Sequence, residues 1–138
     1  MLNLILKKIK EDKIISGKMF NKLDIDELLD LRDEPAFDSE WMRVFNQIKE
    51  LSCSETDMQI IDNIRKESYL KAYQASNSSE IAGCVSDDFD LIAKAYILSI
   101  NDWWLNSVIL MYANDNFPCG EVKILKAEIN EAFSNLTK

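Results

Sequence analysis

The fold is decided by residues 86–118, which read SDDFDLIAKAYILSINDWWLNSVILMYANDNFP. The stretch holds two apolar segments separated by Asn101-Asp102. In the first segment apolar side chains recur at helical spacing on two faces, a pattern typical of a helix buried around most of its circumference. The second, Trp103 to Ala113, is apolar over a wide arc, and the polar run 114–116 followed by Pro118 ends it. The sequence therefore predicts a helical hairpin with both arms in the core.

Polar residues mark the expected start of each arm. Ser86 is the predicted N-cap of the first arm, and Asp87, Asp88 and Asp90 would place negative charge in its first turn, where the helix dipole favours it. Asn101-Asp102 is expected to cap the second arm. The three aspartates also form a set of oxygen ligands of the kind that binds Mg²⁺. Capping explains them without a metal, so a metal-dependent carboxylate enzyme is the weaker hypothesis.

Further amphipathic helices are expected on both sides of this hairpin. They are predicted over residues 2–16 with Gly17 as the stop, 24–34, about 39–51 with Asp38 or Ser39 as the cap, 54–75, a single turn at 80–84, and from Gly120 to Leu136. Only three glycines and two prolines occur in 138 residues, which suits a helical chain. The sequence predicts one all-α domain, 1–138, built as a bundle of six to seven helices around the hairpin 86–118.

The residues that most enzymes use are missing. The chain has no histidine, which removes the commonest general base, the usual nucleophile pairs and the usual transition-metal ligand. It has no glycine-rich phosphate loop, and its three cysteines form no CxxC motif. Cys119 is expected to be an exposed thiol without a histidine partner. A protein that is not an enzyme, and that needs no cofactor or metal, is the prediction.

Charge and hydropathy also limit the expected partners and location. The net charge of −8 disfavours binding to nucleic acid or to an anionic membrane surface. The basic amphipathic stretch 2–16 fits a membrane-surface helix, but lysines on a helix more often mark a solvated face, so docking on the core is predicted. No apolar run approaches the roughly 20 residues of a spanning helix. Scattered cysteines and the lack of a signal peptide favour the cytoplasm.

Negative charge is concentrated in one short segment. Residues 24–40 hold eight acids and a single base, Arg32, so the segment carries −7. Residues 1–23 hold six lysines and two acids and carry +4. One interpretation is a solvated face opposed by these lysines within the fold. The other is an acidic surface for a positively charged protein, for which the candidate partner-binding residues are Asp26, Glu27, Asp30, Asp33, Glu34 and Asp38.

An interface also needs an apolar anchor, and the tryptophan pair supplies a candidate. Successive helical residues point about 100° apart, so if Trp104 faces the core then Trp103 projects outward. Trp103 is therefore the seventh candidate partner-binding residue. The alternative is a tryptophan at the rim of the core.

Taken together, the size, the acidity, the helical content and the lack of catalytic groups resemble a bacterial immunity protein. Residues 86–118 carry the resemblance, from SDDFDLIAKA through WWLN to NDNFP. The family it resembles is the small α-helical immunity proteins of contact-dependent growth inhibition and related polymorphic toxin systems. The resemblance implies a cytosolic protein that binds a cognate toxin domain, often a basic nuclease, and blocks its active site. The alternative is a helical adaptor or regulatory module with an unrelated protein partner.

Overall fold

The computed structural model describes residues 1–21 and 24–138, and in these residues every regular element is a helix. The described residues form seven α-helices and one 3₁₀-helix, η1: α1 (Leu2–Lys10), η1 (Gly17–Phe20), α2 (Ile25–Asp33), α3 (Pro35–Ile48), α4 (Glu55–Ser76), α5 (Ser79–Ile97), α6 (Trp103–Ala113) and α7 (Ile129–Leu136). The prediction of an all-α fold is confirmed. None of the described helices combines the length and the apolar character that crossing a membrane requires.

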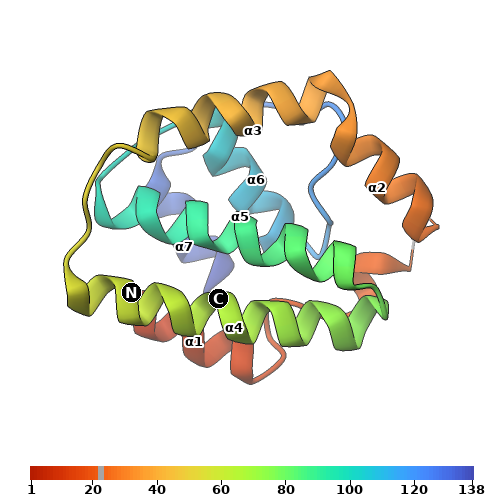
Figure 1. Cartoon of the computed structure of the whole chain (residues 1–138), viewed down its shortest axis with the longest axis horizontal. Coiled ribbons are helices and arrows are strands. Elements are labelled where there is room, and N and C mark those ends of the chain that lie inside the picture. The colour runs from red at the N-terminus through yellow and green to blue at the C-terminus, as the bar shows by residue number, and fades with distance from the viewer. Residues whose placement is uncertain (22–23) are drawn as a thin grey trace.

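The two longest helices, α4 and α5, lie side by side and antiparallel (Figure 1). The predicted cap of α4 is present, because the Ser54 hydroxyl accepts the backbone N–H of Asp57 at 3.1 Å. The reversal into α5 takes one residue in the left-handed region, Asn77 at φ 58°, which asparagine tolerates. Ser78 then caps α5 by accepting the N–H of Ile81 at 3.2 Å. Local polar residues thus fix the turn on which this pair depends.

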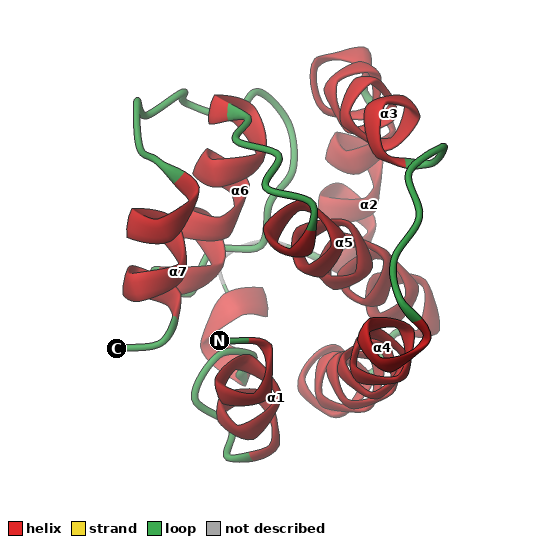
Figure 2. Cartoon of the chain, turned by 90° about the vertical axis from the view of Figure 1, so that its left-hand side faces the viewer, coloured by secondary structure: helices red, strands yellow, loops and turns green. Residues whose placement is uncertain are grey.

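Helix α5 lies in the middle of the molecule, with the other helices around it (Figure 2). Helices α2 and α3 run along one edge, and α1 with α4 lies along the opposite edge (Figure 1). Helix α6 packs mainly against α7. One cluster of buried apolar side chains includes residues from all eight helices. The stretch that dominates the sequence pattern therefore also occupies the centre of the fold.

Both arms of the predicted hairpin are buried, but its first arm begins earlier than expected. Helix α5 starts at Ser79, so Ser86 lies inside it and donates its hydroxyl hydrogen bond to the backbone oxygen of Arg65. The prediction of Ser86 as an N-cap is wrong, and residues 80–84 belong to the same helix. Helix α4 packs along the first arm, α5, and helix α7 packs along the second arm, α6. The second arm, Trp103–Ala113, has the predicted bounds, and Asp102 caps it by accepting the N–H of Leu105 at 3.0 Å.

Asp88 is buried in the centre of the helix bundle and accepts four hydrogen bonds. Arg32 donates from Nη1 and Nη2 to the two carboxylate oxygens at 2.7 and 2.9 Å. Trp41 Nε1 donates at 2.9 Å and the Tyr112 hydroxyl at 2.6 Å. We call these four residues the Asp88 cluster, and they join α2, α3, α5 and α6. Burial and the neighbouring Asp88 charge raise the pKa of Tyr112 well above its ordinary value, so its hydroxyl stays a donor.

This cluster overturns the expectation that Asp87, Asp88 and Asp90 serve a helix start. All three lie inside α5, and Asp88 neutralises the buried guanidinium of Arg32. Asp87 and Asp90 both pair with Arg65, at 2.9 and 3.4 Å. The three carboxylates considered as Mg²⁺ ligands thus form ion pairs with Arg32 and Arg65. Among the described residues no group of cysteine and carboxylate side chains is arranged to hold a metal ion.

Three other helix boundaries differ from the sequence prediction. Helix α1 ends at Lys10 rather than near Gly17, because Asp12 enters the left-handed region at φ 59°. Helix α3 begins at Pro35, which suits the first helical position because its missing N–H needs no partner there. The final helix begins only at Ile129, and residues 121–128 are irregular.

The Asp88 cluster gives a stability prediction with a neighbouring control. Asp88→Asn keeps the shape but leaves the buried Arg32 charge without its counterion, which should cost roughly 3–5 kcal/mol of unfolding free energy. Asp87→Asn removes an exposed pair and should cost about 0–1 kcal/mol. Urea unfolding of both variants measures the difference, and equal losses would contradict a structural role for Asp88.

Asp102 should make stability depend on pH. Burial would raise its pKa, but hydrogen bonds from Arg43 and from the backbone of Leu105 lower it below the usual range. Its contribution to stability is therefore complete above the unfolded-state pKa of about 3.9 and is lost as the pH falls through the lower folded-state pKa. Asp102→Asn retains a capping side chain without the charge, so its stability deficit at pH 6 should shrink below about pH 3.9. Urea unfolding across this range is the measurement, and a constant deficit would refute the assignment.

Candidate interaction surface

Six of the candidate partner-binding residues lie on α2 and at the start of α3. Asp26, Asp30 and Asp33 follow one another at helical spacing on α2. All six side chains are exposed, and we call them the acidic surface: Asp26, Glu27, Asp30, Asp33, Glu34 and Asp38. None of them makes an ion pair or a side-chain hydrogen bond with the described residues. Nothing within the described chain neutralises these carboxylates.

The only base of the segment, Arg32, points the other way. Its side chain is 9% exposed, and it bonds Asp88 and the backbone oxygen of Pro118. Its guanidinium carbon also lies 4.3 Å from the ring centroid of Phe37. Because Arg32 is neutralised from inside by Asp88, it cannot offset the acids on the outside of the same helix.

Helix α1, which carries three of the N-terminal lysines, lies away from the acidic surface. Helix α1 packs against α4, on the edge of the molecule opposite to α2 and α3 (Figure 1). In the described part of residues 1–23 the one ion pair joins Asp12 to Lys71 at 2.9 Å. Lys22, the sixth lysine of this region, lies outside the described residues. The interpretation of the acids as a face balanced by these lysines therefore finds no contact to support it.

A small hollow of about 190 Å³ lies between α2, α3 and α5 at the acidic surface. Asp33 and Asp38 line it together with Asp87, and the wall also includes Phe37, Trp41 and Met42. Carboxylates next to an aromatic and aliphatic wall suit the charged head and apolar stem of lysine or arginine. The hollow can accommodate a single basic side chain from a partner.

The seventh candidate, Trp103, is on a different part of the molecule. It is 47% exposed whereas Trp104 is 4% exposed, so the predicted orientation of the pair is confirmed. The ammonium of Lys126 lies 5.4 Å from the centroid of the Trp103 ring. The partner-binding role of Trp103 stays a prediction, like that of the six acids.

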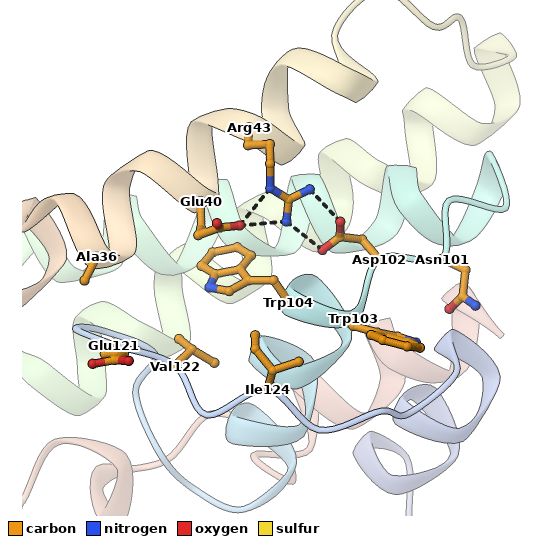
Figure 3. Close-up of a pocket in the computed structure, with 10 residues that line it drawn as sticks. All are labelled: Ala36, Glu40, Arg43, Asn101, Asp102, Trp103, Trp104, Glu121, Val122 and Ile124. Carbon is orange, nitrogen blue, oxygen red and sulfur yellow. Dashed lines mark hydrogen bonds and ion pairs between the residues drawn. The ribbon is translucent and has the colours of Figure 1, made fainter.

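Trp103 borders a groove of about 700 Å³ between α3, α6 and residues 121–124 (Figure 3). The α3 side carries Arg43, which bonds Glu40 at 2.7 Å and spans to Asp102 at 2.7 and 3.2 Å. The opposite side carries Ile124, 48% exposed. The sequence pattern missed this groove because residues 121–128 had been expected to continue a helix. Helix α3 contributes Asp38 to the acidic surface and Glu40 to the groove, so the two features lie on different sides of the same helix.

The remaining reactive groups are poorly suited to catalysis. Burial raises the pKa of the Cys119 thiol and of the Cys84 thiol, which disfavours the nucleophilic thiolate. Cys119 is half-buried rather than exposed as expected. The acidic surface and the groove beside Trp103 both face solvent, as binding surfaces do.

Comparison with known proteins agrees with a binding role. The family model of immunity protein PIM1 matches residues 4–119, which include most of α1, all of α2 to α6, the Asp88 cluster and the acidic surface. No curated protein shows significant similarity to the chain. The match covers most of the 138 residues and confirms the resemblance to immunity proteins, which neutralise toxins. The chain belongs to the immunity protein PIM1 family.

Proposed function

We propose that this protein neutralises its cognate toxin by placing the acidic surface of α2 and α3 over a cationic active-site region of the toxin domain. The observation that carries the proposal is the inward orientation of Arg32, which leaves the six exposed carboxylates without a cation among the described residues. Such a surface attracts a basic protein from a distance and selects against acidic ones. In this proposal the protein acts as a stoichiometric inhibitor and not as an enzyme.

A nuclease is the toxin class that these charges fit best. A nuclease holds a polyanion, so its substrate surface carries lysines and arginines. An acidic protein bound there excludes the nucleic acid by occupying the same cationic groups. The hollow beside Asp33 and Asp38 would hold one basic side chain of the toxin. The encounter would take place in the cytoplasm, where a nuclease toxin meets its substrate, within a contact-dependent or related polymorphic toxin system.

Affinity needs desolvated apolar contacts in addition to charge. Carboxylates exposed at a rim change the association rate more than they change the final affinity. Trp103 supplies an aromatic side chain, 47% exposed, in the groove on the other side of α3 from the acidic surface. We assign it the role of an anchor that leaves water on binding.

The partner can be identified before its surface is mapped. An immunity gene is expected beside its toxin gene, so the toxin domain encoded next to this chain should co-purify with it without added cofactor. Absence of that complex would contradict a cognate pair. The purified toxin domain then serves for the kinetic test.

Charge reversal tests the acidic surface. The triple variant Asp30→Lys/Asp33→Lys/Glu34→Lys breaks no ion pair within the described chain, so it should fold normally. Association with the toxin domain should slow by about tenfold or more at low ionic strength. The deficit should shrink as salt is added, because exposed charges are screened. Stopped-flow or surface-plasmon measurements at several salt concentrations provide the rates.

The matched control reverses three exposed acids elsewhere, Glu50, Asp62 and Glu131, for which no ion pair is present in the described residues. It has the same net charge as the test variant, so it separates local charge from total charge. Equal slowing in both variants, or no slowing in the test variant, would refute the assignment of the acidic surface.

A further inference from the structure

The indole N–H of Trp104 is buried and has no hydrogen-bond partner in the described chain. The side chain is 4% exposed and packs edge-on against Phe37, with ring centroids 5.2 Å apart. It also lines the groove, and its nitrogen faces the side on which Val122 and Glu121 lie (Figure 3). Buried polar groups are nearly always paired, so this donor calls for an acceptor from outside the chain.

Trp41 shows that the fold does pair a buried indole where it can. Its Nε1 donates to Asp88 at 2.9 Å. Asp102, Glu40 and Glu121 line the same groove as Trp104, yet none of them accepts its proton. The first two are engaged by Arg43, and Glu121 makes no ion pair within the described residues. The groove therefore offers one free donor and one free carboxylate.

The wall formed by residues 121–124 is also unpaired. Its backbone makes no hydrogen bond within the described chain, although its neighbours do: Gly120 bonds Leu31 and Leu125 bonds Ser107. Ile124 is 48% exposed and borders the groove together with Trp103. Free backbone groups beside an exposed apolar side chain can bond an extended peptide, as the unpaired edge of a sheet does.

We infer that the groove holds an extended segment of the toxin, whose backbone carbonyl accepts the Trp104 N–H while an apolar side chain lies between Trp103 and Ile124. A lysine or arginine near that side chain would pair with Glu121. The inference rests on the proposed function for the identity of the occupant. The toxin is favoured over another ligand because α3 borders both the groove and the acidic surface, so one partner can contact both. Because this nitrogen is covered in the free protein, the inference requires residues 121–124 to move aside on binding.

The chain has three tryptophans, and their indole signals can be followed separately by ¹H–¹⁵N NMR after assignment with Trp→Phe variants. The labelled protein is titrated with the unlabelled toxin domain encoded by the neighbouring gene. The Trp104 signal should move downfield as its N–H gains an acceptor, and the Trp103 signal should move as it leaves water. The Trp41 N–H already donates to Asp88 and Trp41 lines the hollow at the acidic surface, so a movement of its signal reports on that hollow and not on the groove. Unchanged Trp103 and Trp104 signals in a saturated complex would overturn the inference.

Two neighbouring exposed residues give a matched affinity test. Ile124 borders the groove, whereas Leu125, 43% exposed, is not among the residues that line it. Ile124→Ser should weaken toxin binding about tenfold and Leu125→Ser should leave it nearly unchanged. If both bind like the wild type while the acidic-surface variant binds slowly, the groove inference fails and the proposed function stands. If the acidic-surface variant is unaffected but Ile124→Ser weakens binding, the acidic-surface proposal fails and the groove remains.

Discussion

A buried guanidinium has to be neutralised, and in this protein the requirement ties together four helices, α2, α3, α5 and α6. Arg32 on α2 meets Asp88 on α5, and the remaining lone pairs of that carboxylate are taken by Trp41 on α3 and Tyr112 on α6. Replacing a buried ion pair with apolar groups of similar volume is often neutral or stabilising, whereas breaking it leaves an uncompensated charge. Its main effect is therefore on specificity: it fixes which side of α2 faces inward.

The same constraint shapes the outside of the molecule. With Arg32 turned toward α5, the opposite side of α2 presents only carboxylates, and α3 continues the acidic surface. A single buried pair thus connects the packing of the core with the electrostatics of the surface that we assign to the toxin. All four residues of the Asp88 cluster lie within residues 4–119, the range matched by the immunity protein PIM1 family.

Local signals in the sequence located most helices, because caps and periodicity act within a few residues. Ser54, Asp102 and the Trp103–Trp104 pair all behave as their neighbours in the sequence predict. The role of Asp88 was not predicted, because a serine followed by three acids occurs both at the start of a helix and in its middle. Its partner Arg32 is 56 residues away, and no local pattern reveals that contact. The groove was not predicted for a related reason. Residues 121–128 have helical periodicity, but they are irregular in the structure. Leu125 and Ala127 are instead bonded to Ser107 and Asn106 of α6.

The central claim is that the surface of α2 and α3 binds the toxin. Hydrogen exchange of the free protein and of its complex with the toxin domain tests it most directly, because the footprint requires no substitution. The account predicts slowed exchange in residues 25–48 and around 103–124, with α1 and the outer side of α4 unchanged. Protection confined to α1 and α4, with residues 25–48 exchanging as in the free protein, would contradict it.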